Sequence, residues 1–219
     1  MVTPGRKDAP VIVAIDGPAG AGKSTVGRAV AERLGLEYLD TGAMYRAVTF
    51  AALRRGIDPA DEADVAALAG TVQMAIEASA VVVDGVDATG EIWGREVTAA
   101  VSAVASNAHV RSELVRRHRE WVDEHAGGVV EGRDIGSVVC PDATLKLFVT
   151  ASPRVRAQRR VAELGGDVAE VEASIIERDR KDSTRTESPL TETDDAVTVD
   201  TTGMSIEDVV DHILGLMPA

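Results

Sequence analysis

The stretch IDGPAGAGKST, residues 15–25, has residue types at a spacing that suits phosphate binding. From Gly17 to Ser24 it matches the pattern G-x-x-x-x-G-K-[ST], in which backbone N–H groups of a glycine-rich loop surround a phosphate. In this pattern Lys23 reaches the outer phosphates of a nucleoside triphosphate, and Ser24 ligates Mg²⁺. The residues predicted to bind the phosphates are Gly17, Pro18, Ala19, Gly20, Ala21, Gly22, Lys23, Ser24 and Thr25.

The flanking residues place this loop between a strand and a helix, as the pattern requires. Residues 11–15 form an apolar run typical of a buried strand, and the residues from Thr25 onward have helical spacing. A Walker B acid, which holds Mg²⁺ or its waters, follows an apolar strand directly. Glu131 has this position, but Asp16 could do the same work. The sequence leaves that choice open, and we take Ser24 and Glu131 as the predicted metal residues.

Strands and helices alternate along most of the chain, which predicts an α/β fold with a parallel sheet covered by helices on both faces. Short apolar runs predict strands at 36–39, 129–130, 145–149 and 197–199. Helical spacing predicts helices that begin near residues 42, 61, 109, 153 and 205. Gly127-Gly128 is expected to end the helix that begins near residue 109.

Residues 80–88 interrupt this alternation. β-branched residues lie on both sides of Asp84-Gly85, which is the strongest short signal for a β-hairpin. Antiparallel ribbon inside an alternating strand and helix chain indicates an inserted subdomain at 63–101. We therefore expect a core formed by 11–62 and 102–219, preceded by a flexible tail at 1–10.

The composition is that of an ordinary globular chain and limits its partners. With 219 residues, 45% of them hydrophobic and 27% charged, the chain suits one domain. Its net charge of −13 predicts repulsion from nucleic acid, and no apolar run reaches the ~18 residues of a membrane span. The single cysteine, Cys140, forms no internal disulfide, and 1–10 has no signal-peptide core. A reducing cytoplasm is the expected location.

Basic residues gather in one part of this acidic chain. Eight of them lie between residues 154 and 185. Arg133 follows a predicted strand, and ligands of open α/β folds bind beyond the carboxyl ends of the strands, so it should face the phosphate loop. Phosphoryl transfer needs such residues, because the protein mainly positions phosphates and neutralises their charge. Arg46, Arg133 and Arg185 lie next to a turn or strand end and are the candidates.

Five blocks of the sequence, in their order, resemble those of the bacterial cytidylate kinases, a family of nucleoside monophosphate kinases. They are IDGPAGAGKST (15–25), LDTGAMYRA (39–47), GREV (94–97), EGRDIGSVVCPDA (131–143) and RDRKDSTR (178–185). The resemblance extends from about residue 11 to residue 213. It implies a P-loop nucleoside triphosphate hydrolase-like fold with a five-stranded parallel sheet, a monophosphate-binding insert and a short lid at 154–185. It also implies transfer of the γ-phosphoryl group of ATP, with Mg²⁺, to CMP or dCMP.

The same resemblance assigns residues by matching position. The acceptor phosphate set is Arg46, Arg133 and Arg185, the base-reading set is Thr41, Arg111 and Asp134, and the ribose set is Ser102, Arg178 and Asp182. Lys23, Arg133 and Arg185 are the expected catalytic residues, while Arg156 and Arg160 of the lid are expected to contact ATP. Many relatives have serine in place of Thr41 and aspartate in place of Glu131; both changes keep the hydroxyl or the charge.

Cytosine chemistry agrees with this assignment. The base offers an amino donor at N4 and acceptors at N3 and O2, and Asp134 with Arg111 supplies the complementary groups. Tyr45, Phe50 and Trp93 are candidates to line the base pocket. Two alternatives remain at this stage: a kinase for another small acceptor, and a nucleotide-binding regulatory protein. A monomer is expected, with small nucleotides as its partners.

Overall fold

The computed structural model describes residues 10–77, 80–185 and 188–218. The predicted flexible tail at 1–10 therefore lies outside the described residues, apart from Pro10. No helix in the described ranges is long and apolar enough to cross a membrane.

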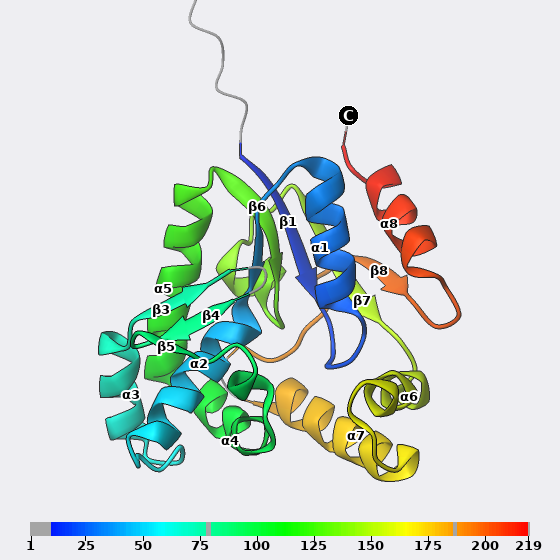
Figure 1. Cartoon of the computed structure of the whole chain (residues 1–219). Helices are drawn as coiled ribbons and strands as arrows, with labels where there is room; N and C mark the ends of the chain where they lie inside the picture. Colours follow the sequence, from blue (N-terminus) through cyan, green and yellow to red (C-terminus); the bar gives the residue numbers. More distant parts are fainter. Residues whose placement is uncertain (1–9, 78–79, 186–187, 219) are drawn as a thin grey trace, which may run out of the picture.

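A five-stranded sheet forms the centre of the molecule (Figure 1), with the strand order β2-β6-β1-β7-β8. Every neighbouring pair in it is parallel, which confirms the predicted fold class. Connections between parallel strands must cross over the sheet, and here they carry the helices. The strands are β1 (Val11–Asp16), β2 (Tyr38–Asp40), β6 (Gly127–Glu131), β7 (Leu145–Thr150) and β8 (Val197–Asp200).

Two hydrophobic clusters cover the two faces of this sheet. Val13 and Ile15 of β1 pack with α1 and α8, whereas Ala14 between them packs with the cluster that contains α2 and α5. This alternation follows from the two-residue period of a strand. In Figure 1, α1 and α8 accordingly lie on one side of the sheet and α5 on the other. The helices are α1 (Lys23–Leu34), α2 (Thr41–Arg54), α5 (Ala108–Glu124) and α8 (Ile206–Gly215).

The segment between α2 and α5 contains a second, antiparallel sheet of three strands. Its hairpin turns at Asp84 and Gly85, whose φ angles of 50° and 76° are those of the turn that the sequence predicted. The hairpin and its neighbours pack beside α2. The elements of the segment are α3 (Glu62–Thr71), β3 (Met74–Ile76), β4 (Val81–Val83), β5 (Val86–Asp87), a single 3₁₀ turn (Glu91–Trp93) and α4 (Arg95–Ser106).

Helices α6 (Pro153–Leu164) and α7 (Val168–Thr184) pack against each other beyond the carboxyl end of the central strands (Figure 1). Ser152 caps α6 through Val155 N–H at 3.3 Å, and Asp167 caps α7. Helix α6 therefore begins where the sequence predicts, and the arginine-rich segment faces the end of the sheet at which the phosphate loop lies.

Two boundaries differ from the sequence prediction. Gly127 and Gly128 do not end a helix; α5 ends at Glu124 and the two glycines begin β6. A Cβ at Gly127 would lie 2.4 Å from the Val11 carbonyl oxygen, so the residue permits close pairing with β1. The second strand begins at Tyr38 rather than at residue 36, because its pairing partners start at Val129.

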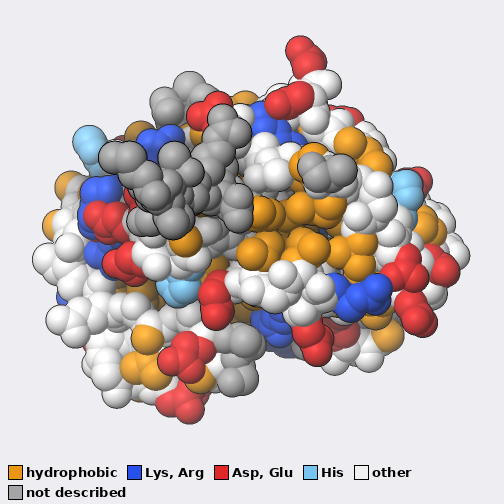
Figure 2. Space-filling model, turned by 90° about the horizontal axis from the view of Figure 1, so that it is seen from above, with side chains coloured by type: hydrophobic (Ala, Val, Ile, Leu, Met, Phe, Trp, Pro, Cys, Tyr) orange, Lys and Arg blue, Asp and Glu red, His pale blue; other side chains and the backbone are white. Residues whose placement is uncertain are grey.

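The end of the molecule that is farther from the phosphate loop is shown in Figure 2. Hydrophobic side chains gather near its centre, and acidic and basic side chains border them. The polar candidate residues lie at the other end of the sheet.

Candidate active site

The phosphate loop joins β1 to α1, and its glycines have the backbone conformations that such a loop requires. Gly17 has a φ of 143°, and a Cβ there would lie 2.0 Å from the Val149 carbonyl oxygen. Lys23 begins α1, is buried and donates from Nζ to the Pro18 carbonyl oxygen at 3.1 Å. Burial, and after it the charge of Arg133, lowers the pKa of Lys23 to about 7. A bound phosphate would supply the negative charge that this ammonium group needs.

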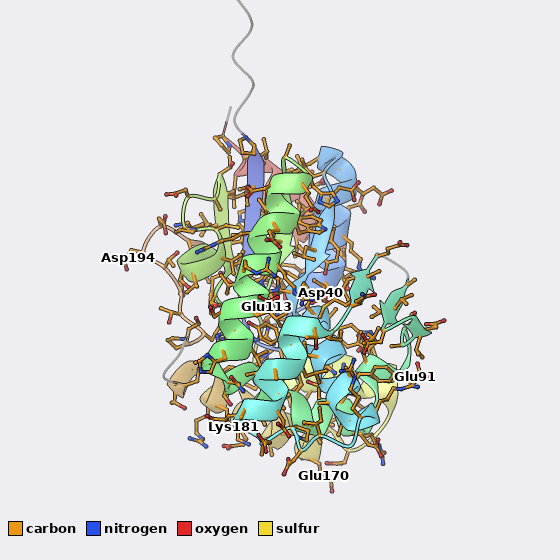
Figure 3. The ribbon with its side chains drawn as sticks, turned by 90° about the vertical axis from the view of Figure 1, so that its left-hand side faces the viewer. Asp40, Glu91, Glu113, Glu170, Lys181 and Asp194 are labelled. Carbon is orange, nitrogen blue, oxygen red and sulfur yellow. The ribbon has the colours of Figure 1, made fainter. Side chains whose placement is uncertain are left out.

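Ser24 and Glu131 lie together, as the metal prediction requires. Ser24 Oγ donates to Glu131 Oε1 at 2.6 Å, and Glu131 Oε2 is buried without a hydrogen-bond partner in the described part of the chain. Burial, and then the charge of Asp40, raises the pKa of Glu131 to about 7. In Figure 3, Asp40 lies near the middle of the molecule, whereas Lys181 lies near its lower edge.

Asp16 has a different environment. Its Oδ1 accepts a hydrogen bond from Ile135 N–H and its Oδ2 accepts one from Gly136 N–H, both at 2.8 Å. Burial raises the pKa of Asp16 to about 6. Both oxygens of Asp16 are therefore engaged by backbone N–H groups, whereas Glu131 has one oxygen without a partner in the described part of the chain.

Arg46 of α2 is buried and is held by the segment that contains the 3₁₀ turn. Its Nη1 donates to the Ile92 carbonyl oxygen at 2.9 Å and to Thr98 Oγ1 at 3.0 Å. Its guanidinium carbon lies 4.6 Å from the centre of the Trp93 ring. Burial lowers the pKa of Arg46 to about 10, and the nearby charges of Arg178 and other arginines add to this effect. Several predicted phosphate and ribose residues therefore crowd into one region of positive charge.

Asp182 of α7 connects two of the predicted phosphate arginines. Its Oδ2 accepts from Arg133 Nε at 3.0 Å, and its Oδ1 lies 3.9 Å from Arg185 Nη1. Arg178 lies one helical turn earlier on α7; burial, and then the charge of Arg133, lowers its pKa. Nε of Arg178 has no hydrogen-bond partner among the described residues. Arg133, Arg178 and Arg185 thus share the one carboxylate of Asp182, and a bound anion would balance their remaining positive charge.

The predicted base-reading residues also come together. Arg111 of α5 forms a buried ion pair with Asp134, and its guanidinium carbon lies 5.5 Å from the centre of the Tyr45 ring. Thr41 Oγ1 donates to the Glu131 carbonyl oxygen at 2.7 Å. Asp134 and Arg111 thus present an acceptor and a donor side by side, in a place where Tyr45 supplies an aromatic surface.

Three other predicted residues have less direct positions. Arg156 is buried and donates to the Ala151 and Ala19 carbonyl oxygens, both at 2.9 Å, and to Asp179 at 2.6 Å. It therefore holds the phosphate loop through the Ala19 carbonyl oxygen. Its contact with ATP stays a prediction. Arg160 lies on α6 with Nη1 3.9 Å from Glu163. Ser102 lies half-buried on α4 and makes no side-chain hydrogen bond within the described ranges.

The roles of several residues near this site were not predicted from the sequence. Residues Ile135–Val139 form a π-helical turn, a rare conformation that is frequent at functional sites. Arg159 donates to Thr201 Oγ1 at 3.0 Å and lies near Gly22, beside the phosphate loop. Trp93 covers Arg46 and not the base-reading pair. The sequence signals were the arginines on α6, the block at 131–143 that contains the turn, and Trp93 itself, which the sequence assigned to the base pocket instead.

The site combines a glycine-rich phosphate loop at the end of a parallel sheet with a group of arginines and the buried Arg111–Asp134 pair. This combination defines a P-loop kinase that acts on a small acceptor. Residues 13–219 match the family model described as cytidylate kinase. The chain belongs to the cytidylate kinase family.

Relatives of high identity agree with the family model. The chain is 47% identical over 221 residues to a cytidylate kinase of Corynebacterium efficiens, with 97% of this chain and 96% of that protein covered. It is 49% identical over 218 residues to a cytidylate kinase of Mycobacterium avium, with 95% and 96% covered.

A solved structure supports the fold. A gluconokinase from Sinorhizobium meliloti matches with a TM-score of 0.52 and 16% identity, covering 94% of this chain and 91% of that one. At this identity the match concerns the fold only.

Proposed function

We propose that this chain transfers the γ-phosphoryl group of ATP to CMP or dCMP and yields ADP with CDP or dCDP. The observation that carries the proposal is the position of the buried Arg111–Asp134 pair, which belongs to the same strand-end region as the phosphate loop. A donor site and a base-reading site would then lie at the same end of the central sheet. Family membership supports this reading and disfavours another acceptor or a purely regulatory role.

The chain's own residues would act mainly on charge and position. Lys23 would leave its contact with the Pro18 carbonyl oxygen and bind the β- and γ-phosphates. Arg46, Arg133 and Arg185 would hold the acceptor phosphate in line with the γ-phosphate. Because negative charge spreads over the transferring oxygens, these cations stabilise the transition state more than the separated substrates.

The donor set around Ser24 fits Mg²⁺. A hydroxyl and a carboxylate are oxygen ligands, and Mg²⁺ in kinases is held by one or two such groups together with substrate phosphates. Glu131 has a buried oxygen that lacks a partner in the described part of the chain, which a metal or its water would satisfy. When bound, the ion neutralises charge on the β- and γ-phosphates. Ser24 and Glu131 are the residues that would hold it.

Base selection would depend on the buried ion pair. Asp134 would accept a hydrogen bond from cytosine N4, and Arg111 would donate to N3 or O2. Thr41 belongs to the same set, while Ser102, Arg178 and Asp182 would bind the ribose. Uracil has a carbonyl oxygen in place of the amino group, which would face the carboxylate with an acceptor.

Two segments would close over the substrates. The insert at 63–101 supplies the groups that hold Arg46, and the lid at 154–185 packs beside the phosphate loop through Arg156. Closure would exclude water, which would otherwise accept the phosphoryl group. The cytoplasmic location and the monomeric state stay predictions from the sequence.

A panel of acceptors tests the proposed function. ADP production would be measured with ATP and Mg²⁺ and with CMP, dCMP, UMP, AMP or shikimate as acceptor. We expect CMP and dCMP to give the highest kcat/KM. Equal or higher activity with AMP or shikimate would contradict the proposal.

A further inference from the structure

Asp16, the last residue of β1, holds the turn that follows Asp134. Its two carboxylate oxygens accept from Ile135 N–H and Gly136 N–H, each at 2.8 Å. The side chain is buried, with the residue 5% exposed. These two amides belong to the residues directly after Asp134, so Asp16 holds the backbone next to that carboxylate.

The turn needs a partner of this kind. The Asp134 carbonyl oxygen accepts from Val138 N–H at 2.8 Å and from Val139 N–H at 3.2 Å, which closes the turn at its far end. The first N–H groups of any helical turn have no partner within the turn itself. Asp16 supplies that partner from another strand, and a carboxylate is well suited because the amide ends of a helical turn are electropositive.

Gly136 permits the close approach of the carboxylate. A Cβ at this position would lie 3.4 Å from Asp16 Oδ2 and 3.1 Å from Lys146 Cδ. A second bond ties the same loop to β1, because Gly132 N–H donates to the Ile15 carbonyl oxygen at 2.9 Å. The base-reading loop is therefore fastened to the end of β1 at two places.

Asp16 is also the residue directly before the phosphate loop. Gly17 follows it at a point where the backbone lies against Val149 of β7 so closely that no Cβ fits. The end of β1 is thus fixed on both sides, by β7 and by the loop after β6. A carboxylate at this point connects the donor side of the site to the acceptor side.

We propose that Asp16 is a positioning residue for base recognition, which sets the orientation of Asp134 and thereby the discrimination between cytosine and uracil. The inference rests on the proposed function, in which Asp134 reads the base. In this proposal Asp16 orients the turn after Asp134 and does not bind Mg²⁺.

Asp16→Asn tests this role with little change in side-chain shape. An amide has one oxygen acceptor, so one of the two turn N–H groups would face the NH₂ group and lose its partner. We expect the ratio of kcat/KM for CMP to that for UMP to fall about 10-fold, whereas KM for ATP stays within about 2-fold. An unchanged ratio would overturn the inference. Equal losses for CMP and UMP with a raised Mg²⁺ requirement would also overturn it, in favour of a metal role.

A readout without substrate separates this inference from the proposed function. Hydrogen exchange of residues 132–139 in the ligand-free protein should be faster in Asp16→Asn than in wild type, and unchanged exchange would contradict the holding role. If Asp134→Asn leaves the CMP to UMP ratio unchanged, the base-reading assignment itself fails. If Asp134→Asn lowers the ratio and Asp16→Asn does not, only the inference fails.

Asp61→Asn is a matched control. Asp61 caps α3 by accepting from two backbone amides, at 3.1 and 3.0 Å, and neither amide belongs to the turn after Asp134. Its substitution should leave the ratio unchanged. If Asp16→Asn does not fold, Gly136→Ala is the second variant, because its added methyl group would crowd Asp16 Oδ2. We expect it to lower the ratio of kcat/KM for CMP to that for UMP by about 3-fold. A wild-type ratio in Gly136→Ala would then overturn the inference.

Discussion

The guanidinium carbon of Arg46 lies 4.6 Å from the centre of the Trp93 ring, so an exposed tryptophan covers a buried arginine. Trp93 is 41% exposed, which is unusual for a side chain of this size. Trp93 belongs to the inserted segment, and one face of its ring packs on Arg46. Arg46 is one of the arginines proposed to bind the acceptor phosphate.

Removing this ring should weaken acceptor binding. A cation–π contact at a partly exposed site contributes about 1 kcal/mol, so Trp93→Ala should raise KM for CMP by about 5-fold and leave KM for ATP nearly unchanged. Trp93→Phe keeps an aromatic face and should have the smaller effect. Trp121→Phe serves as control, because Trp121 stacks on His125 instead. Equal KM values for CMP in Trp93→Ala and wild type would show that the ring does not support Arg46.

Substituting the lysine of the phosphate loop should affect turnover more than binding. Charge on the transferring oxygens is greatest in the transition state, so Lys23→Met should lower kcat by about 100-fold or more. Nucleotide affinity, measured by calorimetry, should fall much less. Turnover within a few-fold of wild type would contradict the phosphate-loop assignment.

The base-reading assignment predicts a selective loss for CMP. An unpaired buried polar group costs about 1 to 3 kcal/mol, so Asp134→Ala should reduce kcat/KM for CMP ten- to several-hundred-fold and for UMP much less. Asp134→Asn should harm CMP less, because its amide oxygen still accepts a hydrogen bond. Asp134 also pairs with buried Arg111, so circular dichroism must first show that the variants fold. Equal fractional losses for the two substrates would make Asp134 a structural partner of Arg111 only.

Joint binding of CMP and an ATP analogue should close the insert and the lid. We expect amide hydrogen exchange to slow at 63–101 and at 154–185 when both ligands are present, because closure shields these segments from water. Each ligand alone, and helix α8 as an internal reference, serve as controls. Lack of protection in both segments would count against closure.

His118 should make the free energy of unfolding depend on pH. Burial, and then the charge of Arg111, lowers its pKa from 6.5 to about 3, and neither ring nitrogen has a hydrogen-bond partner among the described residues. At pH 5 the unfolded chain therefore binds a proton that the folded protein does not. This group contributes stability that is present above pH 6.5 and is lost as the pH falls, by about 2 kcal/mol between pH 7 and pH 5.

Urea unfolding at the two pH values measures this loss. His118→Leu should reduce the difference in unfolding free energy between pH 7 and pH 5 by about 2 kcal/mol relative to wild type. The exposed His109 provides the control His109→Leu, which should keep the wild-type difference. The same difference in His118→Leu and wild type would mean that His118 has the same pKa in the folded and unfolded chains, and would contradict this prediction.

Local patterns in the sequence were enough for the phosphate loop and for the class of the fold. The glycine spacing around Lys23 and the apolar run before it determine a strand, a loop and a helix, because each depends on neighbouring residues only. The hairpin at Asp84 and Gly85 was predicted correctly for the same reason. The positions of Arg46, Arg133 and Arg185 next to a turn or strand end already indicated phosphate binding. Resemblance to a known family added Arg111 and Asp134, and the structure gathers most of these residues at one end of the sheet.

The partners of the buried polar groups were decided only by the tertiary structure. The sequence left open whether Asp16 serves Mg²⁺. Only the folded chain shows that its carboxylate accepts from Ile135 N–H and Gly136 N–H, where the turn after β6 meets the end of β1. The packing of Trp93 on Arg46 and the hydrogen bond from Arg156 to the phosphate loop were likewise visible only in the folded chain. A buried polar atom must find its partner in space, and the candidates come from segments that are far apart in the chain. Strand order and register, which no local pattern encodes, determine which of those segments meet.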